Sequence, residues 1–148
     1  AEVQILALMP NADAGSDGVR AVLSAASGAP GLILYNHLAR ADFIAAMARA
    51  DLMVGNSSAG IIEAASFGTP VLNIGPRQNL RERNTNVHDI TRADAGLGDS
   101  IRALLAKGRL AADNIYRRPG GGRAADRIAD ALASAALDDR LLIKVNQY

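Results

Sequence analysis

Short apolar runs alternate with amphipathic helical patterns along this chain of 148 residues. Runs of this kind are typical of strands buried on both faces of a parallel sheet. We expect strands at 3–9, 32–35, 52–54, 71–74 and, as a short fifth one, 87–90. We expect helices at 19–26, 42–50, 61–66, 100–106 and 123–136, whereas 141–145 fits either element. This order predicts a three-layer, Rossmann-like α/β fold with right-handed crossovers.

Composition limits the classes of function that fit such a fold. Hydrophobic residues make up 49% and charged residues 21%, which is typical of a folded domain. The net charge of +1 argues against nucleic acid as a partner. The chain has no cysteine, no apolar run long enough to span a membrane and no signal-peptide pattern. We therefore expect a cytoplasmic domain over residues 1–136, followed by a tail over 137–148.

One polar loop joins a predicted strand to a predicted helix and has the sequence Gly55-Asn-Ser-Ser-Ala-Gly60. Free N–H groups and the positive end of the helix dipole favour an anion at such a junction. Ser57 and Ser58 add hydroxyl donors, and Gly60 would let a ligand approach the backbone. Helix capping by Ser58 is the simpler alternative, but it explains only one of the two serines. The loop, called the 55–60 loop below, is a candidate phosphate site.

Charged residues follow this loop at the same predicted edge of the sheet. Glu63, placed in the first helical turn, either stabilises the helix dipole or accepts two ribose hydroxyls. Arg77, Arg81 and Arg83 lie in the polar segment 75–86 and either face solvent or bind phosphate oxygens.

The remaining polar positions have simpler structural explanations. Asp13 fits an Asx turn better than a binding role, and residues 120–122 fit a glycine linker. His37 and His88 have no partner at a metal-ligand spacing, so we expect neither a metal nor a cofactor.

Two stretches of the chain resemble one enzyme family. The segment 55–87, GNSSAGIIEAASFGTPVLNIGPRQNLRERNTNV, resembles the C-terminal half of the hydrolysing UDP-N-acetylglucosamine 2-epimerases, including those of sialic-acid synthesis. Residues 10–16, PNADAGS, are similar to another loop of that family. The resemblance implies the C-terminal half of a glycosyltransferase-B-type fold that binds UDP or UDP-N-acetylglucosamine.

The resemblance also implies roles for individual positions. Ser57 and Ser58 would hold the diphosphate and Glu63 the ribose. Further UDP contacts are implied at Asn11 and Arg77. Beside the uracil, the resemblance places Leu38, with Phe43 just behind it.

Two departures from the family pattern accompany the resemblance. The family's acidic catalytic residues belong to an N-terminal domain that this sequence does not contain, so the catalytic residues are unknown. The family's NPYGDG-like loop corresponds here to residues 114–122 and lacks the aspartate. We therefore expect an enzyme half that is inactive alone, partnered by its N-terminal domain, with homo-oligomer formation left open.

Two other classes of function remain open from the sequence. The chain could be the UDP-sugar domain of a glycosyltransferase, because that fold also reads diphosphate with a helix N-terminus. It could also be a nucleotide-binding module without chemistry. The string NSSAGIIEA followed by PRQ distinguishes the epimerases from the glycosyltransferases.

Overall fold

The computed structural model describes residues 3–12, 15–111, 113–117, 123–136 and 138. Its strands are β1 (Ile5–Leu8), β2 (Leu32–Tyr35), β3 (Met53–Gly55), β4 (Val71–Ile74) and β5 (Val87–Ile90). Its helices are α1 (Ser16–Ala25), α2 (Arg40–Arg49), α3 (Ser58–Ile62), α4 (Leu97–Lys107) and α5 (Ala124–Ser134), with short 3₁₀ turns η1 (Ala64–Phe67) and η2 (Pro76–Gln78). This alternation confirms the predicted order of elements.

The chain divides into two compact units, Ala1–Asn114 and Ile115–Tyr148. Among the described residues, the first contains all the strands and the second contains α5. The Asx turn expected at Asp13, the glycine linker 120–122, the segment 141–145 and all of the tail except Asp138 lie outside the described residues.

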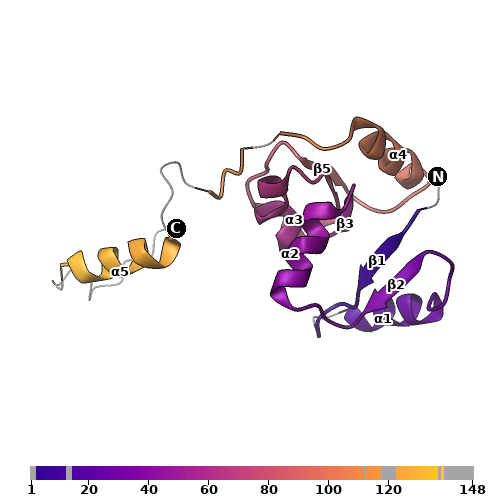
Figure 1. Ribbon diagram of the computed structural model, residues 1–148, viewed down its shortest axis with the longest axis horizontal. Helices are drawn as coiled ribbons and strands as arrows, with labels where there is room; N and C mark the ends of the chain where they lie inside the picture. Colours follow the sequence, from indigo (N-terminus) through magenta and orange to yellow (C-terminus); the bar gives the residue numbers. More distant parts are fainter. Residues whose placement is uncertain (1–2, 13–14, 112, 118–122, 137, 139–148) are drawn as a thin grey trace. The chain divides into compact units, whose positions relative to one another are not determined.

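All strand pairs are parallel, as expected for an α/β fold of the Rossmann-like class (Figure 1). Ile5 lies opposite Leu32 in the β1–β2 ladder. In the second ladder β4 is central, between β3 and β5. The fold class is confirmed, whereas the division of the strands into two hydrogen-bonded ladders was not predicted.

Burial differs sharply between the two ladders. In β4, Val71, Leu72 and Asn73 are all buried, because both α3 and α4 contact this strand. In β1, Ile5 and Leu6 each keep about half of their surface exposed. The expectation of strands buried on both faces is correct for β4 and wrong for β1, which has β2 as its only strand partner among the described residues.

The helix expected at 61–66 is instead two short pieces. Ser57 caps α3, since its Oγ accepts from the Ala59 N–H at 3.3 Å, so the helix begins at Ser58. It breaks at Glu63, and η1 follows until Gly68, whose φ is 65°. A Cβ at Gly68 would lie 2.6 Å from the Leu110 carbonyl oxygen, so this position requires glycine.

Helices that are long and apolar enough to cross a membrane are absent from the part of the chain that the structure describes.

Candidate functional site

Two of the predicted polar loops meet at the carboxyl ends of β3 and β4. The Asn56 carbonyl, in the 55–60 loop, accepts from Arg77 Nη1 at 3.1 Å and from Gln78 Nε2 at 2.9 Å. Arg77 is exposed, whereas Gln78 is only 3% exposed. The turn η2 therefore fixes the loop that carries Ser57 and Ser58, and it places the Arg77 side chain against that loop. In the third predicted loop, Asn11 is exposed.

The start of α3 keeps several donors unused. Ser57 is the N-cap residue, and its carbonyl also accepts from the Gly60 N–H at 3.2 Å. The N–H groups of Ser57 and Ser58, and the Ser58 hydroxyl, make no hydrogen bond with the described residues. The structure assigns the cap to Ser57, so the simpler alternative for Ser58, helix capping, is wrong. Ser57 therefore caps α3 through its Oγ, while the hydroxyl of Ser58 and the N–H groups of both serines stay available as donors.

Gly60 is buried against the sheet. A Cβ there would lie 2.9 Å from Val71 Cγ1 and 3.6 Å from Met53 Sδ. Its missing side chain lets α3 lie close to β3 and β4, so packing accounts for this glycine, and the approach of a ligand to its backbone stays a prediction.

Glu63 does not lie in the first turn of α3, as the sequence predicted, but directly after its last residue. A carboxylate at the C-terminal end of a helix opposes the helix dipole, so dipole stabilisation of α3 does not explain this residue. Its side chain is 27% exposed and forms an ion pair with Arg40. Arg40 is the first residue of α2, where a cation is also unfavourable. The ion pair thus joins the end of α3 to the start of α2, and Glu63 is at the same time the residue that precedes η1.

This ion pair has an electrostatic consequence for Arg40. The hydrogen bond and the negative charge of Glu63 raise the pKa of the Arg40 guanidinium above its ordinary value. The Glu63 carboxylate is thus already in contact with a hydrogen-bond donor when no ligand is present.

The three arginines of the segment 75–86 have different surroundings. Arg83 Nε donates to Asp89 Oδ2 at 2.9 Å, and its Nη1 donates to the carbonyls of Gln78 and Arg81. The Arg83 hydrogen bond lowers the pKa of the Asp89 carboxyl; partial burial opposes this shift, and a hydrogen bond from Asn73 reinforces it. Arg83 therefore shapes the loop, whereas the Arg81 guanidinium is exposed and has no partner among the described residues.

Leu80 lies in the same segment and has an unusual backbone. Its φ is 70°, in the left-handed region that favours glycine, and its side chain is fully exposed. Such a conformation costs on the order of 1–3 kcal/mol and is most often found at binding and switch regions.

The two residues expected beside a base lie at the start of α2. Leu38 is half-buried, and Phe43 packs against the hydrophobic core formed by Met47, Ala59, Ala64 and Val71. A structural role therefore accounts for Phe43, and contact with uracil stays a prediction for both residues.

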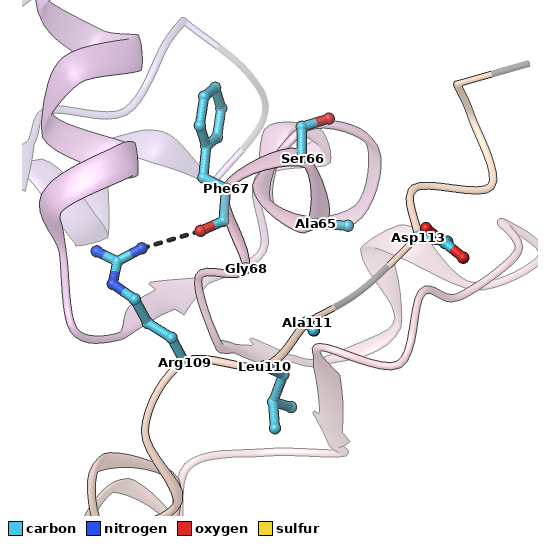
Figure 2. Close-up of a pocket in the computed structure, with 8 residues that line it drawn as sticks. All are labelled: Ala65, Ser66, Phe67, Gly68, Arg109, Leu110, Ala111 and Asp113. Atoms are coloured by element: carbon cyan, nitrogen blue, oxygen red, sulfur yellow. Dashed lines mark hydrogen bonds between the residues drawn. The ribbon is translucent and has the colours of Figure 1, made fainter.

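A separate hollow of about 460 Å³ lies beside η1 (Figure 2). Figure 2 shows the Arg109 guanidinium turned toward the Phe67 carbonyl, to which it donates at 3.0 Å. Arg109 also donates to the carbonyls of Ala48 and Ala50 at the end of α2. None of the predicted site residues lines this hollow; its lining is Ala65, Ser66, Phe67, Gly68, Arg109, Leu110, Ala111 and Asp113.

Sequence reasoning missed four residues that shape the predicted site. These are Arg40, Gln78, Asn84 and Asn114. Arg40 lies two residues before the predicted helix 42–50, so the helix pattern gave no signal for its acidic partner. The asparagines carry no local signal either. Groups of three or more potential metal ligands are absent among the described residues.

Comparison with known proteins identifies the chain's relatives. The family model for UDP-N-acetylglucosamine 2-epimerase matches residues 1–133. The chain is 39% identical over 146 residues to a UDP-N,N'-diacetylbacillosamine 2-epimerase (hydrolyzing) of Legionella pneumophila, covering 99% of this chain and 38% of that protein. It is 26% identical over 128 residues to a UDP-N-acetylglucosamine 2-epimerase of Neisseria meningitidis, covering 86% and 34%.

A third relative matches over a shorter stretch. This GDP/UDP-N,N'-diacetylbacillosamine 2-epimerase (hydrolyzing) of Campylobacter jejuni is 43% identical over 56 residues, covering 38% of this chain and 15% of that protein. The chain thus spans well under half the length of the curated relatives it matches. The family match over most of its length, together with the parallel α/β fold, shows that the chain belongs to the UDP-N-acetylglucosamine 2-epimerase family.

Proposed function

We propose that this chain is the nucleotide-binding half of a hydrolysing UDP-sugar 2-epimerase. In the complete enzyme, UDP-N-acetylglucosamine and water would give UDP and N-acetylmannosamine. The observation that carries the proposal is the 55–60 loop: it follows β3, η2 fixes it, and it retains unused N–H and hydroxyl donors at Ser57 and Ser58. Donors of this kind favour phosphate oxygens.

The other parts of UDP would be bound by neighbouring residues. Glu63 would accept the ribose hydroxyls, with its carboxylate oriented beforehand by Arg40. Arg77, next to the loop, and the exposed Arg81 would bind phosphate oxygens. The remaining contacts would come from Asn11 and, beside the uracil, from Leu38 and Phe43.

This half would contribute to the reaction by stabilising its leaving group. Negative charge grows on the diphosphate as UDP departs, so donors at Ser57 and Ser58 would act in the transition state as well as in binding. We propose that the acidic catalytic residues belong to an N-terminal domain of the same enzyme, and that the chain alone releases no UDP. Its cytoplasmic location and homo-oligomer formation stay predictions.

Two sugars are candidates for the sugar part of the substrate. The identity to the Legionella protein, which is named for a diacetamido sugar, favours a UDP-2,4-diacetamido sugar as the second candidate beside UDP-N-acetylglucosamine. Release of UDP from each nucleotide by the protein with its N-terminal domain would decide between them.

A calorimetric titration with UDP and inorganic phosphate tests the binding role. We expect UDP to bind more tightly than phosphate, although weakly, because only one side of the cleft is present. Equal affinities for the two ligands would contradict the proposal.

Glu63→Gln tests the ribose contact. It should weaken UDP binding by about 1–3 kcal/mol, the scale of a hydrogen bond to a charged group. Binding of 2′-deoxyuridine diphosphate should weaken less, because that ligand has only one of the two hydroxyls. Asp99→Asn, which removes a charge at an exposed site, is the matched control and should change neither affinity. If Glu63→Gln weakens the binding of UDP and of 2′-deoxyuridine diphosphate equally, Glu63 does not bind the ribose.

A further inference from the structure

The break between α3 and η1 leaves a backbone carbonyl without its helical donor. In a continuous α-helix, the Ile62 carbonyl would accept from the Ser66 N–H. Here the Ser66 N–H donates to the Glu63 carbonyl instead, at 2.9 Å. Glu63 has φ −111° and ψ −37°, away from ideal helical values. The residue expected to bind ribose is therefore the residue at which the helix changes type.

Two asparagine side chains occupy the carbonyls at this break. Asn114 Nδ2 donates to the Ile62 carbonyl at 2.8 Å and to Ser66 Oγ at 2.7 Å. Asn84 Nδ2 donates to the Ile61 carbonyl at 3.0 Å and lies 3.4 Å from Asn114 Oδ1. The two amides thus bind the two backbone carbonyls that precede Glu63, and Asn114 also reaches the side chain of Ser66, three residues after it.

From this geometry we infer that Asn114 is a positioning residue for the Glu63 carboxylate; the inference rests on the proposed function, in which Glu63 binds ribose. Asn114 Nδ2 and the Ser66 N–H compete for the Ile62 carbonyl. While Asn114 occupies it, the Ser66 N–H bonds to Glu63 and the break persists. Without Asn114, the helix can continue through Glu63, which changes the direction of its Cα–Cβ bond.

A carboxylate that accepts two adjacent hydroxyls depends strongly on that direction. Both oxygens must face the ribose at once, and displacement of one oxygen removes one charge-assisted hydrogen bond. Arg40 contacts the carboxylate group, but its own side chain is exposed and long. The backbone at Glu63 therefore needs a second restraint, which Asn114 supplies.

The contact also gives a structural role to Asn114, the first residue of the segment 114–122. The missing aspartate put substrate binding by this loop in doubt, whereas the structure gives its first residue a contact with α3 and η1. Asn114 acts on the nucleotide through Glu63 and does not need to touch it.

The test compares UDP with 2′-deoxyuridine diphosphate in the protein and its variants by calorimetry. The unmodified protein should prefer UDP by about tenfold, the scale of one charge-assisted hydrogen bond. Asn114→Ala, and Asn114→Asp, which keeps the shape but loses the donor, should reduce this preference to about threefold or less. Phosphate affinity should stay unchanged, because the 55–60 loop is not involved. In a Glu63→Gln background, Asn114→Ala should have no further effect on the preference.

Asn86→Ala is the matched control. Asn86 is another buried amide, which donates to the Thr69 carbonyl and not to the break, so its loss destabilises the fold without altering the preference. The inference about Asn114 would be overturned if either Asn114 variant still unfolds cooperatively in urea and keeps the full preference for UDP. The ribose role of Glu63 would not be affected by that result. If neither Asn114 variant folds, Ser66→Ala takes their place; it removes one acceptor of the Asn114 amide and leaves the bond to the Ile62 carbonyl, so the expected loss is smaller, and a full ribose preference in this variant would overturn the inference. An unmodified protein without ribose preference would overturn the ribose role of Glu63, and the inference with it.

Discussion

The two parallel ladders have similarly apolar strands in very different surroundings. The β1 sequence ILAL is mostly aliphatic, and yet none of its residues is buried. The β4 sequence VLNI includes an asparagine, and three of its four residues are buried. An apolar run therefore indicates a strand, but the elements that pack on it decide whether it becomes core.

The buried polar residues sharpen this contrast. All of them lie between η1 and β5, around the predicted site, and they are Thr69, Asn73, Gln78, Asn84 and Asn86. Each donates a side-chain hydrogen bond, in most cases to a backbone carbonyl. Packing and specific polar contacts hold the second ladder together, whereas the contacts of the first ladder are mainly the backbone hydrogen bonds between β1 and β2.

The largest effect should come from shortening matched leucines in the two ladders. Leu72 is 0% exposed and Leu6 is 46% exposed. Leu72→Ala should lower the free energy of unfolding by about 2–5 kcal/mol, because it leaves a cavity in a packed core. Leu6→Ala should cost about 1 kcal/mol or less. Urea unfolding measures both, and equal costs would mean that chain outside the described residues covers β1.

A smaller effect is expected from the arginine that joins two helix ends. Arg109 donates hydrogen bonds to carbonyls at the C-terminal ends of α2 and η1. The helix dipole also favours a cation at such an end. Arg109→Ala should destabilise the protein by about 1–2 kcal/mol in thermal or urea unfolding.

Arg102→Ala is the control for this substitution. Arg102 pairs only with Asp99 on an exposed face, so its loss should stay within about 0.5 kcal/mol. Similar losses for the two arginines would show that the helix-end contacts contribute nothing of their own.

The smallest effect is a pH dependence at the edge of the second ladder. Arg83 lowers the pKa of Asp89 in the folded protein, so the stabilisation is complete above the ordinary aspartate pKa. It is lost as the pH falls through the lowered value. The Asp89 side chain is 46% exposed, and solvent screening keeps the contribution below about 1 kcal/mol.

Asp89→Asn should therefore flatten the fall in stability that begins below about pH 5 and continues as the pH drops through the lowered pKa of Asp89, measured by urea unfolding at each pH. An unchanged slope would mean that Asp89 contributes nothing to acid sensitivity.

Local pattern was enough to predict most elements. The strands at Leu32–Tyr35, Val71–Ile74 and Val87–Ile90 have the predicted limits, and the first two are apolar-rich runs bounded by polar or turn residues. The meeting of the 55–60 loop with Arg77 also follows from a general rule, that the carboxyl ends of parallel strands share one edge.

The parts that failed depend on residues far away in sequence. The backbone at Glu63 depends on two amides far along the chain. Asn84 lies 21 residues later and Asn114 lies 51 residues later. Gly60 faces the sheet because Val71 lies behind it, which no local pattern states. The role of Arg83 depends on Asp89 in the next strand. Tertiary contacts of this kind give no signal in a single sequence.

The Asn114 contact has a consequence for how the protein is made. The ribosome synthesises a chain from its N-terminus at about 5–20 residues per second. The 55–60 loop and Glu63 therefore leave the ribosome several seconds before the asparagine that fixes the break, since the carbonyl it contacts lies 52 residues upstream. During that interval α3 can extend through Glu63. The proposed ribose contact is consequently fixed in place after the 55–60 loop beside it has been synthesised.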